Sequence, residues 1–261
     1  MNWNNNIQLK SFLDEKAELY ENLEFIENDP IQIPHLFSRK EDIEIAGFLT
    51  AIIAWGQRKT IISNAKKLMK LMDDAPFDFL INHQDQDLKA FTRFVHRTFN
   101  SDDLLYFIYR LKWMYKEEGG LEGVFGESIN SNNGNMLMAI SQFKAHFFKL
   151  EHLKRSEKHL SDPEKGSSAK RINMFLRWMV RSDKKEVDFG LWTGIAPSSL
   201  YIPLDVHTGN VARQFDLISR KQNDRKALEE LMINLREMDP IDPVKYDFAL
   251  FGMGVNGEVF G

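Results

Sequence analysis

The sequence of 261 residues contains no cysteine. This absence excludes disulfide bonds, thiolate-bound zinc, iron–sulfur clusters and a cysteine nucleophile. It also fits a reducing compartment, where proteins do without disulfides. The chain has no His-Glu-x-x-His pair and no paired-carboxylate motif, so little favours a metal-dependent hydrolase built on Asp205, His207 and other histidines. We therefore expect neither a metal nor a cofactor.

Long apolar runs are also missing. The longest lies near 46–55 and is too short and too interrupted to span a bilayer. The first residues, Met-Asn-Trp-Asn-Asn-Asn-Ile, have neither the basic start nor the apolar stretch of a signal peptide. We expect a cytoplasmic protein that does not associate with membranes, and we expect a monomer.

Excess charge of one sign is absent overall but present locally. The net charge of −4 gives no signal for nucleic acid. Between 144 and 185, however, twelve Lys and Arg stand against five Asp and Glu, an excess of seven positive charges. A basic segment on an acidic body is typical of a surface for a polyanion. A solvated helix face with acidic partners in the same chain accounts for the numbers equally well.

Apolar residues recur at spacings of three and four and rarely alternate, which predicts an all-α fold. With 43% hydrophobic residues the chain can form one large domain or two small lobes. Ser38 is expected to cap a helix that begins near Glu41. The polar stretch 126–135 is expected to be a loop. The expected helices are 7–28, 41–56, 60–72, 76–82, 104–117, 136–153, 170–181, 206–216, 224–238 and 244–253.

The helix at 170–181 separates apolar from polar positions. The apolar residues follow the spacing of a core-facing side: Ile172, Phe175, Leu176 and Met179. The polar residues form a stripe on the opposite side: Lys170, Asn173, Arg177 and Arg181. A Gly-Ser-Ser loop at 166–168 precedes the helix. Backbone N–H groups at a helix start, two hydroxyls and two cations together suit a phosphate.

Asp205 stands directly before the next helix. The commoner role of such a residue is an N-cap that accepts from the N–H of Thr208, worth about 1 kcal/mol. In that case His207 would be a packed histidine facing Val211 and Phe215. The functional alternative uses Asp205 as an ionised acid that stabilises a developing cation or positions an amine nucleophile.

Several motifs occur in a meaningful order. Leu-Asp-Val-His at 204–207 is followed in register by Val211-Ala212, and Phe-Leu-Thr-Ala-Ile-Ile-Ala-Trp-Gly-Gln occupies 48–57. Tyr-Asp-Phe-Ala-Leu-Phe-Gly-Met-Gly occupies 246–254. Over about 43–254 the chain thus resembles the helix-hairpin-helix DNA glycosylase/AP lyase superfamily. It looks nearest to an uncharacterised bacterial family, DUF2400-like, whose hallmark is Lys-Arg-(Ile/Leu)-Asn-Met-Phe-Leu-Arg-Trp-Met-Val-Arg, found here at 170–181. It is also similar to archaeal 8-oxoguanine DNA glycosylases.

The resemblance implies a two-lobed helix-hairpin-helix architecture with a cleft between the lobes. One lobe would be 46–185, ending in the hairpin and the basic helix, and the other would combine 1–45 with 186–261. It implies binding of duplex DNA that carries a damaged base, such as 8-oxoguanine, or an abasic site. The damaged base would be extruded into the cleft.

The resemblance also assigns roles to residues. The amine of Lys170 would attack C1′ and form a Schiff base, assisted by Asp205. Trp55 and Gln57 would belong to the base pocket. Contacts to DNA and its phosphates would come from Lys165, Gly166, Ser167, Ser168, Arg171, Arg177 and His207.

The chain departs from the superfamily at the hairpin, which reads Ser-Asp-Pro-Glu-Lys-Gly-Ser-Ser at 161–168. Aligned on Pro163, the usual lysine position is Ser168, and the nearest lysines are Lys165 and Lys170. Lys170 is preferred because the archaeal relatives place a lysine directly before an apolar helix, with a long gap to the acid. These departures keep a second hypothesis open, a non-catalytic nucleic-acid-binding module on the same scaffold.

Overall fold

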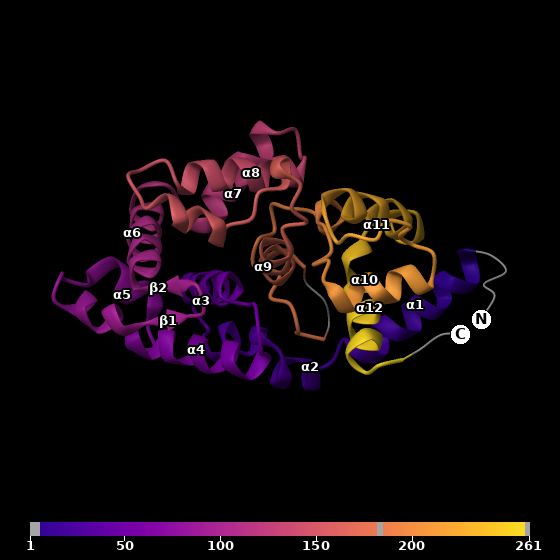
Figure 1. Cartoon of the computed structure of the whole chain (residues 1–261), viewed down its shortest axis with the longest axis horizontal. Helices are drawn as coiled ribbons and strands as arrows, with labels where there is room; N and C mark the ends of the chain where they lie inside the picture. Colours follow the sequence, from indigo (N-terminus) through magenta and orange to yellow (C-terminus); the bar gives the residue numbers. More distant parts are fainter. Residues whose placement is uncertain (1–5, 182–184, 259–261) are drawn as a thin grey trace. The chain divides into compact units, whose positions relative to one another are not determined.

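The computed structural model describes residues 6–181 and 185–258. This part of the chain contains twelve α-helices and short 3-10 turns (Figure 1). Its β-structure is limited to one isolated bridge and a two-stranded antiparallel hairpin, β1 (Val95–His96) and β2 (Phe99–Asn100). The predicted all-α class is confirmed. No helix in the described ranges is long and apolar enough to cross a membrane.

The chain divides into two compact units. Unit 1 consists of Met1–Phe25 and Asp162–Gly261, and unit 2 consists of Ile26–Ser161. The lobes expected from the resemblance have their boundaries at 45/46 and 185/186 instead. With the boundaries of the structure, the helix that begins at Lys170 belongs to the same unit as Asp205.

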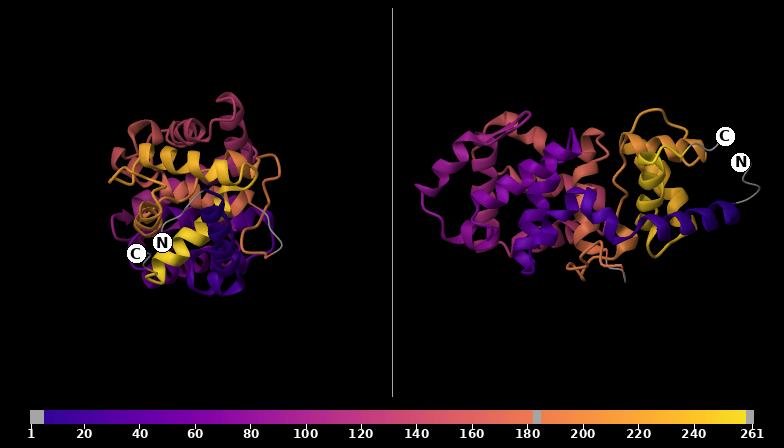
Figure 2. Two further views of the ribbon diagram at one scale, coloured as in Figure 1. Left: turned by 90° about the vertical axis from the view of Figure 1, so that its right-hand side faces the viewer. Right: turned by 90° about the horizontal axis from the view of Figure 1, so that it is seen from below.

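Unit 1 brings distant parts of the sequence together. Its helices are α1 (Asn6–Tyr20), α9 (Lys170–Val180), α10 (Val206–Gln214), α11 (Arg225–Met238) and α12 (Tyr246–Val255), with 3-10 turns at Pro163–Lys165, Pro197–Ser199 and Pro243–Lys245. The indigo α1 packs along the yellow α12, and α10 packs against α12 as well (Figures 1 and 2). The buried residues of α1 include Leu9, Leu13 and Ala17, which recur at a spacing of four, as on a core-facing side.

Unit 2 is continuous in sequence. Its helices are α3 (Lys40–Ile52), α4 (Arg58–Leu71), α5 (Pro76–Asn82), α6 (Ser101–Glu117), α7 (Gly120–Ser131) and α8 (Met136–Phe147), with 3-10 turns at Pro30–Gln32, Pro34–Leu36, Asp87–Arg93 and Lys154–His159. The short α2 (Leu23–Asn28) crosses the boundary between the units. The core of unit 2 is aromatic: Phe48 lies within 6.2 Å, between ring centroids, of Phe107, Phe143 and Phe147.

Three local predictions differ from the structure. The first helix is interrupted after Tyr20 and resumes as α2, whereas one helix over 7–28 was expected. The residue before α3 is Arg39, so the predicted cap at Ser38 is wrong. The predicted loop 126–135 is helical as far as Ser131, because Leu121, Val124, Phe125 and Ser128 continue a buried three-and-four pattern.

Candidate functional site

The turn before α9 places Lys170 at the start of that helix. Gly166 has a left-handed backbone, with φ of +88°, which favours glycine. Ala169 is also left-handed, with φ of +47°, and the helix begins directly after it. The side chain of Asn173 donates from Nδ2 to the carbonyl of Ser168 at 2.9 Å. These contacts fix the direction from which the chain enters α9.

Lys170 and Asp205 form an ion pair. The distance from Lys170 Nζ to Asp205 Oδ2 is 3.1 Å, and the side chains are 36% and 12% exposed. The other carboxylate oxygen, Oδ1, accepts from the N–H of Thr208 at 2.9 Å, so the predicted N-cap is confirmed. The two roles considered for Asp205 therefore use different oxygens of one carboxylate.

The backbone of Asp205 is held by the segment before α11. Asn223 donates from Nδ2 to the carbonyl of Asp205 at 2.7 Å, and Arg213 donates to the Asn223 Oδ1 at 2.6 Å. A Cβ at Gly209 would lie 2.5 Å from that same Oδ1. Glycine at 209 is therefore what lets Asn223 approach the first turn of α10.

A buried carboxyl on α12 lies within electrostatic reach of the pair. Asp247 accepts a hydrogen bond from Arg177 on one oxygen, and Oδ1 has no hydrogen-bond partner among the residues described. Burial raises the pKa of Asp247 to about 7, in spite of Arg177, which lowers it. The charge of Asp205 raises this pKa further, and that of Lys170 lowers it. Asp247 is therefore electrostatically coupled to both members of the ion pair.

Arg177 of α9 and Arg181, the residue directly after the helix, are internal counter-ions. The Arg177 side chain is 3% exposed, and its Nε lies 3.2 Å from Asp188 Oδ1. Arg181 pairs with Glu21 and lies 2.8 Å from Asp242 and 3.4 Å from Asp188. Burial opposes the charge of Arg181, but these three acids together raise its pKa. The guanidinium groups are held by acids from several segments of unit 1.

The polar stripe of α9 is thus buried, although the sequence pattern sets it opposite the core. Asn173, Arg177 and Arg181 are 1–3% exposed, and only Lys170 at the helix start reaches solvent to a useful extent. The spacing showed two sides of a helix but not the acids that come to the second side from elsewhere. Arg177, for which a phosphate contact was predicted, is therefore inaccessible to an external phosphate.

The remaining predicted phosphate residues differ in accessibility. Lys165 is 74% exposed and Gly166 is exposed, whereas Ser167 is half-buried and Ser168 is buried. Arg171 is half-buried, and burial lowers its pKa to about 10, so it is still a cation at neutral pH. Lys165 and Gly166 are the members of this set that an external phosphate can reach most easily.

His207 lies at the exposed start of α10. Its Nδ1 is 3.1 Å from the carbonyl of Gly254, to which it can donate, and its ring centroid is 6.0 Å from that of Phe251. The side chain is therefore placed by the end of α12, where the sequence suggested Val211 and Phe215 as its neighbours. His207 therefore lies in the first turn of α10, the helix that Asp205 caps.

The two residues predicted for a base pocket lie in unit 2. Trp55 is partly buried, with its ring edge-on to His96 at 4.9 Å and nearly parallel to His159 at 5.9 Å. The amide of Asn64 contacts His96 Nδ1 at 2.9 Å, and His96 Nε2 is 3.1 Å from the Trp55 carbonyl. Since an amide nitrogen donates and a carbonyl accepts, the His96 tautomer with its proton on Nε2 satisfies both contacts. Gln57 is exposed at the start of α4.

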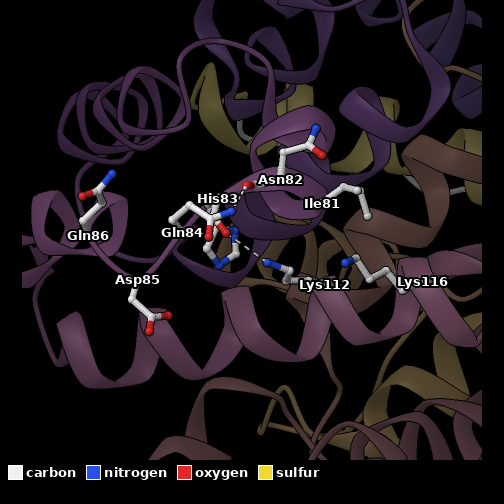
Figure 3. Close-up of a pocket in the computed structure, with 8 residues that line it drawn as sticks. All are labelled: Ile81, Asn82, His83, Gln84, Asp85, Gln86, Lys112 and Lys116. Atoms are coloured by element: carbon white, nitrogen blue, oxygen red, sulfur yellow. Dashed lines mark hydrogen bonds between the residues drawn. The ribbon is translucent and has the colours of Figure 1, made fainter.

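Two pockets were found away from the ion pair. One of about 700 Å³ lies in unit 2, where Lys112 and Lys116 of α6 point toward the turn after α5 (Figure 3). Burial lowers the pKa of Lys112, and neighbouring Lys116 lowers it further. Another, of about 330 Å³ in unit 1, lies between Pro163, Glu164 and Gly166, in the turn before α9, and the start of α11. Neither is lined by Lys170 or Asp205. In the described ranges no group of three or more His, Asp or Glu could hold a metal ion.

A comparison with protein families gives a match over most of the chain. The family described as "Protein of unknown function (DUF2400)" matches residues 29–256. The chain belongs to this family. Comparisons with curated proteins and with solved structures gave no match.

The ionic cluster of unit 1 consists of three cations and five acids: Lys170, Arg177, Arg181, Glu21, Asp188, Asp205, Asp242 and Asp247. The DUF2400 match includes all of these residues except Glu21. The predicted membership of a DUF2400-like family is confirmed. The resemblance to DNA glycosylases stays a prediction for this DUF2400 protein.

Sequence reasoning missed the site roles of Asp247, Asp188 and Asn223 in this DUF2400 protein, as well as the pairing of Arg181 with Glu21 and Asp242. Asp247 carried a usable signal, because it is the one charged residue in the ten of α12. Asp188 also stands beside apolar residues, in Val-Asp-Phe. Asn223 carried none, since an Asn in a polar connection is ordinary and its role depends on the close approach at Gly209.

Proposed function

We propose that this protein is a DNA repair glycosylase with AP lyase activity, in which Lys170 forms the Schiff base and Asp205 assists. The observation that carries the proposal is the 3.1 Å contact between Lys170 Nζ and Asp205 Oδ2. The resemblance assigned the nucleophile and the acid to these two residues, which are far apart in sequence. Their contact in unit 1 supports that pairing.

The chemistry requires Lys170 to exchange its proton. As an ammonium ion it has no free electron pair, so the proton must first leave to solvent or to the departing base. The neutral amine can then attack C1′ as the C1′–N bond breaks, and the base leaves with the bonding electrons and a proton. The second amine proton then passes to O4′ as the C1′–O4′ bond breaks, which opens the sugar and gives the protonated Schiff base, from which the strand can be cleaved by β-elimination.

The acids around Lys170 suit a reaction whose intermediates are cationic. Both the sugar at C1′ and the Schiff base carry positive charge along this path, and a fixed carboxylate stabilises such charge. Asp205 is oriented for this role by its N-cap bond and by Asn223. Asp247, whose pKa burial raises, adds a buried acid that interacts electrostatically with Lys170.

The proposed partner is duplex DNA with a damaged base, such as 8-oxoguanine, or an abasic site, and no cofactor is required. Lys165 and Gly166 are exposed in the turn before α9 and are proposed to contact phosphate, with Ser167, Ser168 and Arg171 beside them. His207 is exposed at the start of α10 and is proposed to contact the backbone too. Trp55 and Gln57 are proposed for the base pocket.

A second candidate is a non-catalytic nucleic-acid-binding module. It is favoured by the same ion pair, because a lysine beside an N-cap aspartate also stabilises a helix junction without any chemistry. Under this alternative Lys170 stays protonated and serves as a phosphate contact.

The deciding experiment is borohydride trapping on duplexes that contain an abasic site or 8-oxoguanine. We expect a covalent adduct with the wild type, no adduct with Lys170→Gln, and much slower base excision with Asp205→Asn. Lys165→Gln is the matched control and should still be trapped. An adduct that survives Lys170→Gln would remove Lys170 as the nucleophile. Binding without adduct or excision on a panel of damaged bases would favour the binding module.

A further inference from the structure

The outer face of α4 in unit 2 is basic along its whole length. Lys59, Ser63, Lys66 and Lys70 are exposed and recur at spacings of four, three and four, so they form one stripe along the helix, with Lys67 beside it. We call these five residues the α4 basic face. The helix contains no acidic residue.

The charges of this face are not neutralised within the described structure. In the described ranges Lys59, Lys66, Lys67 and Lys70 take part in no ion pair or side-chain hydrogen bond, whereas Lys40, Lys112, Lys149 and Lys154 of unit 2 each have such a contact. Unit 2 as a whole contains 18 Lys and Arg and 18 Asp and Glu. The α4 basic face is therefore a local excess of positive charge on a unit whose net charge is zero, and an external anion can neutralise it.

The opposite side of α4 is already occupied. Ile61, Ala65, Leu68 and Met69 are at most 5% exposed in the core of unit 2. A helix that lies on a membrane needs its apolar side for the lipid. Because that side is buried and no exposed large hydrophobic residue occurs on α4, only electrostatic contact and hydrogen bonding are available to a partner.

We propose that the α4 basic face binds the sugar–phosphate backbone of duplex DNA. The inference rests on the proposed function only in taking duplex DNA as the nucleic acid. Lysine and serine side chains are typical of contacts to the phosphates of DNA. Such contacts position a protein on the duplex without reading its sequence. The stripe extends about 17 Å from Lys59 to Lys70 at 1.5 Å per residue, long enough to meet several phosphates at about 3.4 Å of helix axis per phosphate in one strand.

The ends of the face are also defined. At its start the side chain of Arg97 lies against Gly56, and this exposed arginine likewise makes no ion pair in the described ranges. At its end Asp73 and Asp74 follow directly after α4 and bring negative charge. We therefore expect Arg97 to extend the DNA contact and Lys70 to be its other limit.

The test compares two charge-matched double variants of the full chain. Lys66→Gln with Lys70→Gln removes two lysines four residues apart on α4, and Lys112→Gln with Lys116→Gln removes two lysines four residues apart on α6. The binding constant for an undamaged duplex is measured over a range of salt concentrations. The slope of log K against log salt concentration is negative, and each lost phosphate contact reduces its magnitude by about 0.9. We expect a drop of about two for the α4 variant and little change for the α6 variant, with unchanged circular dichroism for both.

The outcomes separate this inference from the proposed function. If the wild type forms no borohydride adduct but binds the duplex, and only the α4 variant loses salt dependence, the proposed function fails and the α4 basic face stands. Equal slopes for the two variants overturn the α4 assignment, as does a wild type that does not bind duplex DNA, whatever the trapping shows. An α4 effect seen only with phosphatidylserine vesicles would equally overturn it, in favour of a lipid surface.

Discussion

The helices α9 and α4 are both rich in cations, and the structure treats them in opposite ways. In α9 and at its end, Arg177 and Arg181 are buried and held by several acids. On α4 the lysines are exposed and unpaired. Local charge along a sequence thus predicts a basic surface only when the acids that fold back onto it are known.

The difference follows the choice of cation. A guanidinium presents five donors in a fixed plane and is weakly hydrated, so it tolerates burial between carboxylates. An ammonium group on a flexible stem keeps its water and stays at the surface. The buried cations of the α9 stripe are Arg177 and Arg181, whereas its partly exposed cation is Lys170. On α4, four of the five cations are lysines.

Removing a buried arginine should have the largest effect. Arg177→Met leaves Asp188 and Asp247 without their shared cation, and breaking a buried pair in this way costs about 3–5 kcal/mol. The free energy of unfolding from urea denaturation measures the loss. Lys67→Met on α4 is the matched control and should stay within about 0.5 kcal/mol. Similar values for the two would break the distinction between the helices.

The buried acid should make stability depend on pH. The pKa of Asp247 is about 7 in the folded protein and 3.8 in an ordinary chain. Between these values the folded state holds a proton that the unfolded state has released, so stability falls as the pH rises from about 4 to 7. The fall is at most about 1.4 kcal/mol per pH unit.

Asp247→Asn lacks this titration. The stability of the variant relative to the wild type should therefore grow from pH 4.5 to 7 and then stay constant, as followed by urea denaturation at several pH values. Parallel curves for the two proteins would show that Asp247 is ionised throughout.

Substitution of Lys170, at the solvent-accessible start of α9, should change the free energy of unfolding as little as a substitution on α4. Lys170→Gln removes an ion pair that is partly open to solvent, and such pairs contribute about 0–1 kcal/mol. The N-cap bond of Asp205 to Thr208 remains in the variant. Thermal and urea unfolding should therefore differ little from the wild type, while trapping is lost. A cost near that of Arg177→Met would place Lys170 with the buried cations.

The smallest effect is expected on α4 and should be a gain. Lys66 and Lys70 are four residues apart on an exposed helix face and repel each other. Lys66→Glu replaces this repulsion by an attractive pair in the favourable orientation, worth about 0.2–0.5 kcal/mol. Stability should rise slightly while DNA affinity falls. A loss of stability would mean that Lys66 has a structural role.

Local patterns predicted what depends on neighbours in sequence. The helical class, the cap at Asp205 and the helices near 206–216 and 224–238 followed from periodicity and start signals. The helix through 126–131 was missed because its polar composition outweighed a buried pattern that begins earlier, at Leu121.

The site was predicted in part. The contact of Lys170 with Asp205 was expected only through the resemblance, since nothing in spacing brings residues 170 and 205 together. The partners of Arg177 and Arg181 come from positions 21, 188, 242 and 247, and no periodicity connects these. Burial of the α9 stripe could not be inferred without them. The isolation of the α4 lysines likewise depends on which acids fold nearby.

The interrupted unit 1 has a consequence for synthesis on the ribosome. Unit 2 is one continuous segment, so all its contacts are available once residue 161 has emerged. The first helix, α1, was made before any of it, yet its packing partner α12 begins only at Tyr246. Since chains emerge from the N-terminus onward, α1 must wait with its apolar side uncovered while the intervening helices are made. The ionic cluster around Asp247, which depends on Glu21 at one end and α12 at the other, is among the last parts of the protein to form.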